Sequence, residues 1–191
     1  GPGRTSHADS VPGTGEGGPL GIPVTFARRG PAKSRVTFDS ADESAGGPTP
    51  IPATALAEGG PQAGGDRHVL VVDPATCTDY ELYDAHRNSD GSWKAGSGAV
   101  FNLGSDALRP AGWTSADAAG LPILPGLARY DEAATGTIDH ALRITVPASR
   151  NTFVWPARHA AGDSGANLPP MGLRLRLKAN VDISHLPAQA R

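Results

Sequence analysis

The chain has 191 residues, of which 25 are glycine and 18 are proline, so nearly a quarter of its positions favour turns. Both residues destabilise helix interiors, and this composition excludes a mostly helical protein. Charged residues make up 19%, with 17 basic and 19 acidic side chains and a formal net charge of -2. This balance gives no general attraction to nucleic acid, and no apolar run reaches the roughly 18 residues that a membrane-spanning helix needs. We therefore expect neither a nucleic-acid partner nor a membrane span.

The chain divides by composition into three parts. Residues 1–20 are rich in glycine and proline, and we expect a flexible arm or the remnant of a tag. Residues 21–184 are expected to form a β-rich domain, and residues 185–191 to be the start of a truncated C-terminal element. Cys77 is the only cysteine, so no disulfide forms within the chain. We expect its side chain to be a small buried apolar group.

Short runs of β-branched and apolar residues, separated by turn residues, predict strands. The expected strands cover residues 22–27, 35–39, 67–73, 79–83, 98–103, 140–146, 152–155 and 173–178. The first two are expected to pair with each other across the turn at residues 28–31. The turns are too short for crossover helices, so we expect antiparallel pairing. The predicted fold is mostly β, a single antiparallel β-sandwich or curved sheet with long Gly/Pro-rich loops and under about 15% helix.

Residues 113–136 form the longest insertion between predicted strands. Thr114 or Ser115 is suited to cap a short helix over residues 116–119, and residues 129–134 are suited to another turn or two of helix. Pro122 and Pro125 interrupt the pattern between these two stretches.

Several stretches of the chain resemble an uncharacterised family of exported bacterial proteins, common in soil actinobacteria and their relatives. The matching runs are GPLGIP at 18–23, DES at 42–44, PIP at 50–52, GDRHVLVVD at 65–73, YELY at 80–83, GSGAVF at 96–101, LRPAGWTSADAAGLPILPG at 108–126, HALR at 140–143, WPARH at 155–159 and PPMG at 169–172. The resemblance implies a secreted or cell-surface location and further sequence on both sides of this span. It implies no activity.

Two histidines begin rows of residues that face the core of predicted strands. His68 precedes Leu70 and Val72 on one face, and His140 precedes the alternating apolar residues of the 140–146 strand. At the end of such a row an imidazole either lines the mouth of a cleft, where it can exchange protons, or caps the core with a hydrogen bond. Both interpretations remain open.

A second group of candidates follows the predicted strand at residues 152–155. Trp155 can stack on a sugar ring, Arg158 can hold a carboxylate, and His159 can exchange protons near neutral pH. The alternative is a buried tryptophan, with the arginine bonded to loop carbonyls.

The insertion and one strand supply the remaining candidates. Trp113 and Asp117 are candidate substrate-binding residues, although the aspartate also suits the first turn of a helix. Asp79 and Glu81 share one face of a strand, and such pairs can reach the roughly 5 to 9.5 Å between the carboxyl groups of glycosidases. Glu81 is therefore a candidate catalytic residue, with solvated surface charges as the alternative.

We expect no cofactor and no metal site. The six histidines show no paired ligand spacing, so a zinc or copper site would require the fold to assemble His68, His140 and His159. Phosphate-loop and dinucleotide-binding motifs are missing as well.

The sequence thus predicts an exported β-rich domain that binds or acts on glycans, as a carbohydrate-binding protein or glycoside hydrolase. Its cleft would lie between the loop at Trp113 and the strands that begin at His68 and His140. The alternative is a non-catalytic interaction or structural module that assembles with partner chains, or with itself, through its Gly/Pro-rich arms.

Overall fold

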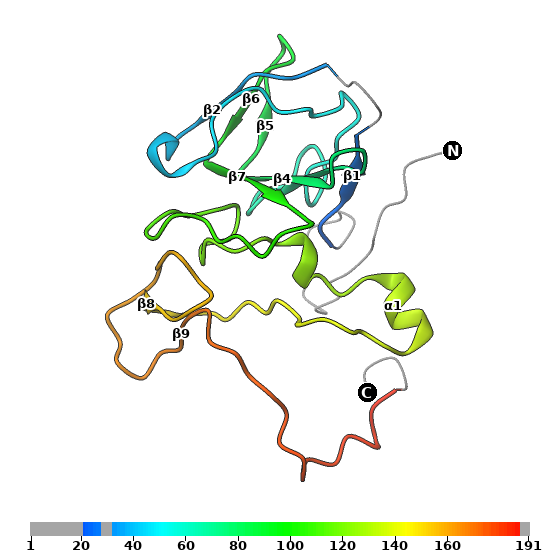
Figure 1. Ribbon diagram of the computed structural model, residues 1–191, viewed down its shortest axis with the longest axis vertical. Helices are drawn as coiled ribbons and strands as arrows, with labels where there is room; N and C mark the ends of the chain where they lie inside the picture. Colours follow the sequence, from blue (N-terminus) through cyan, green and yellow to red (C-terminus); the bar gives the residue numbers. More distant parts are fainter. Residues whose placement is uncertain (1–20, 28–31, 188–191) are drawn as a thin grey trace.

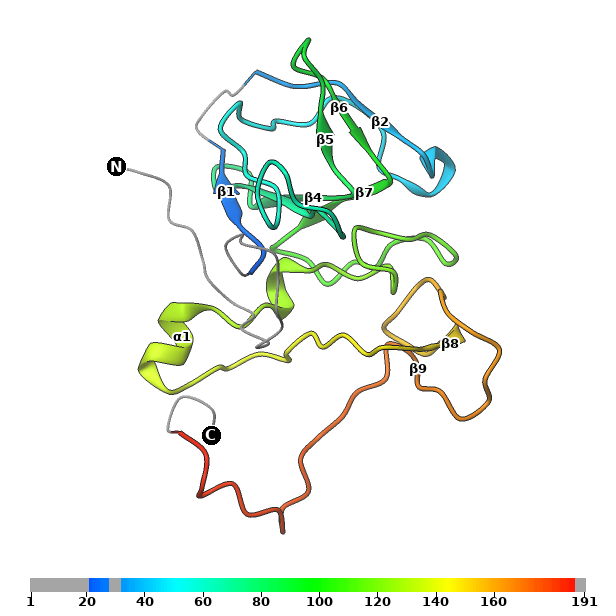
Figure 2. The same cartoon turned by 180° about the vertical axis from the view of Figure 1, so that it is seen from behind.

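The computed structural model describes residues 21–27 and 32–187, so the expected arm at 1–20 and the last four residues lie outside the described part. Its strands form three small sheets (Figure 1). The two larger sheets lie together at one end of the molecule, and residues 128–187 run beneath them in the picture (Figures 1 and 2). The mostly β prediction is confirmed.

The largest sheet has four strands in the order β1-β3-β4-β7. They are β1 (Val24–Phe26), β3 (Val69–Asp73), β4 (Thr78–Tyr83) and β7 (Ser97–Asn102). The antiparallel pairs β3–β4 and β4–β7 confirm the predicted hairpin and the strand beside it. β1, however, runs parallel to β3 instead of pairing with the next strand in the chain.

Two smaller sheets complete the β structure. One has the order β2-β6-β5, with β2 (Val36–Phe38) parallel to β6 (Trp93–Ala95), which is antiparallel to β5 (His86–Arg87). The other pairs β8 (Arg150–Phe153) with β9 (Pro170–Met171), also parallel. The expectation of uniformly antiparallel strands is therefore wrong, because three pairs join strands that are distant in sequence.

Both faces of the largest sheet are buried. On one face, Val69 and Val71 of β3 join Leu82 of β4 and reach across to Trp93 and Ala95 of the second sheet. On the other face, the side chains belong to a cluster covered by the segment that follows β7. This second cluster contains Ile22, Val24, Leu70, Val72, Ala116, Ile123 and Leu127.

Helical structure is sparse in the described residues. The helix expected at 129–134 is present as α1 (Tyr130–Thr135), and it ends at Gly136, whose φ of 78° suits glycine. Short 3-10 turns occur at η1 (Ala41–Glu43) and η2 (Leu124–Gly126). The helix expected at 116–119 is absent, because Ser115 and Asp117 bond to the nearby backbone and fix a loop there.

Two expected strands are wrong. Residues 140–146 and 173–178 are extended but lie outside every strand of the described part of the chain. Their alternating apolar residues are exposed to solvent instead of buried, among them Leu142, Ile144, Leu175 and Leu177. Alternating apolar and polar residues give an extended segment one apolar face, but a strand also needs a neighbouring strand to supply hydrogen-bond partners for its backbone N–H and C=O groups.

Cys77 is exposed, with a left-handed φ of 50° in the turn between β3 and β4, so its expected burial is wrong.

Within residues 21–27 and 32–187, no helix is long and apolar enough to cross a bilayer.

Candidate functional site

An open cleft of about 680 Å³ lies where several distant segments meet. It is bordered by the start of β3, the end of β4, the loop at 114–118, the chain at 143–146 and the residues from His159 to Ala161. Many polar and titratable residues stand in its described lining, beside apolar surface. They include Asp39, Glu43, Asp66, Asp84, Asp117, His68, His159, Arg143, Tyr83, Ser97 and Ser115.

The loop at 114–118 owes its shape to a buried serine. The Ser115 hydroxyl donates to the Leu121 carbonyl at 2.6 Å and accepts from the Asp117 amide at 2.9 Å. The Ser97 hydroxyl of β7 donates to the Ser115 carbonyl at 2.7 Å and fixes the loop to the sheet. These bonds place the loop backbone beside the ends of β4 and β7.

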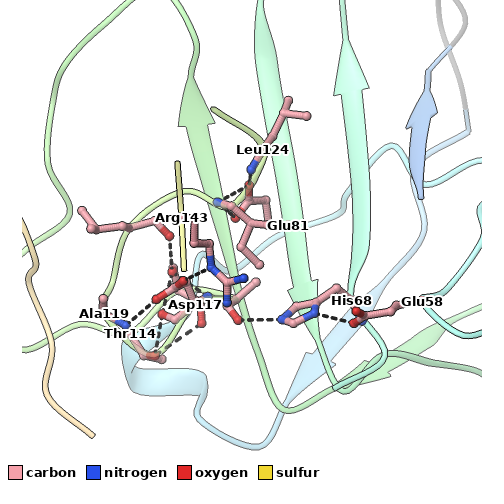
Figure 3. Close-up of polar contacts among 12 residues, drawn as sticks. Glu58, His68, Glu81, Thr114, Asp117, Ala119, Leu124 and Arg143 are labelled. Atoms are coloured by element: carbon pink, nitrogen blue, oxygen red, sulfur yellow. Dashed lines mark hydrogen bonds and ion pairs between the residues drawn. The ribbon is translucent and has the colours of Figure 1, made fainter. Parts of the chain in front are cut away.

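Asp117 is held in place by two partners. Its Oδ1 accepts from the Ala119 amide at 2.7 Å, and its Oδ2 pairs with the guanidinium Nε of Arg143 (Figure 3). The Arg143 amide in turn donates to the Gly126 carbonyl at 2.8 Å. The predicted site residue Asp117 therefore lines the cleft as half of an ion pair.

His68 lines the cleft and is only 3% exposed. Its Nδ1 is 2.7 Å from Glu58 Oε2, and its Nε2 is 3.2 Å from the Ala116 carbonyl oxygen (Figure 3). Burial tends to raise the pKa of Glu58, but the hydrogen bond and charge of His68 outweigh it, so that this pKa lies below 4.5. Both ring nitrogens of His68 thus face oxygen atoms, which fixes the imidazole between β3 and the loop.

His159 lines the same cleft. Its Nδ1 is 2.8 Å from the Ala118 carbonyl oxygen, and its Nε2 is 3.5 Å from Glu43 Oε2. Glu43 Oε2 also accepts from the Thr114 amide at 3.2 Å. Glu43, which follows β2 in the chain, is therefore the carboxylate that faces His159.

The structure does not bring His140 to this cleft. Its Nε2 is 3.2 Å from Glu132 Oε2 of α1, and its Nδ1 is 3.0 Å from the Ala141 carbonyl oxygen. The expectation that His68 and His140 meet at one rim depended on the 140–146 strand. Because that segment joins no sheet in the described part, His140 stays with α1.

The tryptophan and arginine candidates divide between two places. Arg158 Nε donates to the Arg109 carbonyl at 2.8 Å, which is the loop-bonding alternative given above. Trp113 is half-buried, with the Arg109 guanidinium 5.4 Å from its ring centroid. Trp155 is 64% exposed, so the buried alternative is wrong for it. It borders a second, largely apolar cavity of about 460 Å³, next to Pro156.

Glu81 and Asp79 lie in the core, and the solvated alternative is wrong for both. In the pairing of β3 with β4, Glu81 stands opposite Leu70 and Asp79 opposite Val72, so both lie on the same face of the sheet as these apolar residues. Both side chains are fully buried. The Glu81 carboxylate accepts from the Ile123 amide at 2.8 and 2.9 Å and from the Leu124 amide at 2.8 Å (Figure 3). Glu81 therefore fastens the segment before η2 to the sheet and does not line the cleft.

The two buried carboxyl groups perturb each other. Burial raises the pKa of Asp79 from 3.8 to about 6, although the neighbouring Glu81 carboxyl group and Tyr80 backbone act in the opposite direction. Burial, followed by the charge of Asp79, raises the pKa of Glu81 well above 4.5. No N–H or hydroxyl of the described residues donates to either oxygen of Asp79. Its contact with Glu81 becomes a hydrogen bond when one of the two carries a proton.

The described residues hold no group of three or more His, Cys, Asp or Glu side chains suited to a metal ion. The conditional metal site at His68, His140 and His159 needs the three rings to converge. His140, however, pairs with Glu132 of α1, and the other two rings line the cleft.

Sequence reasoning missed three residues that shape the cleft. Glu43, Glu58 and Arg143 are not among the candidate residues selected from the sequence, and Glu58 lies in a Gly/Pro-rich stretch that carries no strand or helix pattern. The sequence carries no marker that pairs these residues with His159, His68 and Asp117, because every pair joins separate loops.

Comparison of the chain with protein-family models, with curated proteins and with solved structures finds no match. The family resemblance stays a prediction, and the function has to be argued from the geometry of the cleft.

Proposed function

We propose that this protein binds glycans in the cleft between His68 and His159 and carries out acid–base chemistry there. The observation that supports the proposal is convergence: His68, Asp117 and His159 come from three separate segments and line one open cleft of about 680 Å³. A volume of that size is in the range of small-molecule sites. The two larger sheets, which share one hydrophobic cluster, would form the sandwich that supports the cleft.

The lining favours a ligand rich in hydroxyl groups. Carboxylates accept hydrogen bonds from sugar hydroxyls, and Asp39, Asp66 and Asp84 offer them around the rim. Tyr83 supplies an aromatic ring, which lies 5.9 Å from the His68 ring centroid. Asp117 and Asp39 pair with Arg143 and Lys94, but Glu43, Asp66 and Asp84 pair with no lysine or arginine of the described residues. The described lining is therefore acidic, and we expect neutral or amino sugars to be preferred over acidic ones.

His159 is the group that we assign to proton transfer. A bond from its Nδ1–H to the Ala118 carbonyl leaves Nε2 free to exchange a proton, with Glu43 at 3.5 Å able to stabilise the charged ring. His68, with both nitrogens occupied and its ring buried, is a positioning residue in this scheme. Glu81 and Arg158 support the loop that carries Asp117, and an exported location is part of the same proposal.

A glycan array probed with the full chain, followed by calorimetric titration of the best ligand, tests the proposal. His159→Ala should reduce affinity at least tenfold while the melting temperature stays within a few degrees. His140→Ala is the matched control, because it removes an imidazole that does not line the cleft, and it should bind as the parent does. If the parent binds no glycan, or if both variants lose affinity equally, the proposal is wrong.

Trp155 provides a separate test of the extent of the site. It is exposed beside the second cavity, so a long glycan that reaches beyond the cleft would stack on it. Trp155→Ala should then weaken binding of longer oligosaccharides and leave that of single sugars unchanged. Equal loss for both would place the ligand at Trp155 instead of the cleft.

A further inference from the structure

The segment at residues 173–178 leaves the body of the protein directly after β9. Gly172, with a φ of 79°, makes the turn, and a Cβ there would collide with the Val154 carbonyl oxygen and the Ala157 side chain. After residue 174, the described chain runs apart from the sheets in both views (Figures 1 and 2). The turn at Gly172 thus directs the segment away from the sheet that precedes it.

The segment has the side-chain pattern of a strand without a neighbour. Leu173, Leu175 and Leu177 alternate with basic residues and are 47%, 71% and 57% exposed. The backbone N–H and C=O groups of residues 174–177 have no hydrogen-bond partner within the described part of the chain. An extended segment with these two properties can add to another strand.

The charge of the segment restricts what can pair with it. Arg174, Arg176 and Lys178 stand at alternate positions, and none forms an ion pair with a described residue. Arg174 lies 5.3 Å from the Trp155 ring centroid. Pairing with the same segment of a second copy would place basic residues opposite basic residues, which is unfavourable. Residues 140–146 offer no acidic alternative, because their charged members are His140 and Arg143.

We propose that residues 173–178 pair as a β strand with an extended segment of a partner protein that alternates apolar and acidic residues. The leucines would pack against the apolar side chains of the partner, and its carboxylates would lie opposite the three basic residues. A partner strand would also supply hydrogen-bond partners for the free backbone N–H and C=O groups of this segment. An anionic lipid surface would attract the same charges, but it offers no donors and acceptors in strand register. None of residues 173–178 lines the cleft, so this proposal does not rest on glycan binding there.

Fluorescence anisotropy with the full chain and a labelled peptide tests the proposal. The probe is a nine-residue peptide that alternates valine and glutamate, and the control peptide carries lysine in place of glutamate. The acidic peptide should bind at least tenfold more tightly than the basic one. Hydrogen exchange of residues 174–177 should slow when it is bound.

Charge reversal supplies the decisive variant. The triple variant Arg174→Glu, Arg176→Glu and Lys178→Glu should bind the basic peptide and lose the acidic one. The triple variant Lys33→Glu, Arg35→Glu and Arg87→Glu changes the net charge equally at exposed positions elsewhere, and it should behave as the parent does. Inverted preference in the first variant alone supports the proposal.

Four results would overturn it: equal binding of both peptides, no binding of either, the same inversion in the second triple variant, or no change in exchange at 174–177. Binding only to vesicles that contain phosphatidylserine would assign the segment to a membrane surface instead. A dimer of the parent with slow exchange at 174–177 would assign it to a second copy.

Discussion

Asp79 and Glu81 stand two residues apart on β4 with both carboxyl groups fully buried, yet only Glu81 accepts backbone N–H groups. After burial, the largest influence on the pKa of each carboxyl group is the other carboxyl group. Two like charges this close and this deep cannot both be ionised without a large cost, so the pair retains a proton to higher pH than a free carboxyl group does.

Asp79→Asn should stabilise the protein at pH 7. The pKa of Asp79 is about 6 in the folded protein against an ordinary 3.8, so between these values the native state binds more protons than the unfolded state. The stability of the parent should therefore fall as the pH rises from about 4 to about 6. A shift of this size corresponds to about 3 kcal/mol. Urea denaturation of both proteins from pH 4 to 7.5 measures it, and a variant that is less stable than the parent at pH 7 would contradict the prediction.

Glu81→Ala should destabilise the protein by about 2 to 4 kcal/mol, because it leaves two buried N–H groups without an acceptor and opens a cavity. The amides of Ile123 and Leu124 should exchange faster with solvent, which native-state hydrogen exchange detects. Glu81→Gln keeps one acceptor oxygen and should lie between the parent and the alanine variant. Unchanged exchange at both amides would show that Glu81 does not fasten this segment.

Glu58→Gln should lower stability at neutral pH by about 1 kcal/mol, because it removes the carboxylate from the bond to His68. The pKa of Glu58 is lowered in the folded protein, so the ionised carboxylate contributes stability above its ordinary pKa. That contribution is lost as the pH falls through the lower, folded value. Parent and variant should therefore converge in stability once the pH is below the folded pKa of Glu58, and a difference that stays constant from neutral to acid pH would be inconsistent with the bond.

Gly120→Ala should cost more than a glycine substitution elsewhere in the same loop. Gly120 has a φ of 70°, and an added Cβ would lie 2.5 Å from the Trp113 carbonyl oxygen and 3.1 Å from Arg158 Cβ. Gly112 has a φ of 87° but open space around it, so Gly112→Ala carries only the backbone cost of about 1 kcal/mol. The difference in melting temperature between the two variants measures the steric cost of the added Cβ at Gly120. Equal losses of stability would show that the structure around Gly120 adjusts to the Cβ without cost.

The sequence predicted the fold best where neighbouring strands pair through short turns. Arg67 to Leu103 contains β3, β4 and β7 close to the expected positions, because turn residues and apolar runs mark them, whereas β5 and β6, which lie between β4 and β7 in the chain, were not predicted. The parallel pairing of β1 and β2 could not be foreseen, because each strand has only three residues and its partner is distant in the chain. Residues 140–146 and 173–178 have the sequence pattern of strands, but their backbones pair with no strand among the described residues.

The candidate site was predictable only in part. His68, Asp117 and His159 were selected by residue type and line one cleft, but their partners Glu58, Arg143 and Glu43 were not selected. The burial of Asp79 and Glu81 was missed, because alternating acids resemble a wet face until register places them opposite Val72 and Leu70. Residue type reveals what a side chain can do, and its partner depends on how distant loops meet.

The parallel pairs also set an order of events during folding. A ribosome releases β1 and β2 before β3 and β6, with which they pair, so neither N-terminal strand can be completed while it is the newest part of the chain. Closing those long loops costs entropy that the β3–β4–β7 meander does not incur. The meander is therefore expected to form first and to serve as the template on which β1 and β2 are added. In stopped-flow experiments, Val24→Ala in β1 should accelerate unfolding and leave the refolding rate nearly unchanged, whereas Val71→Ala in β3 should slow refolding.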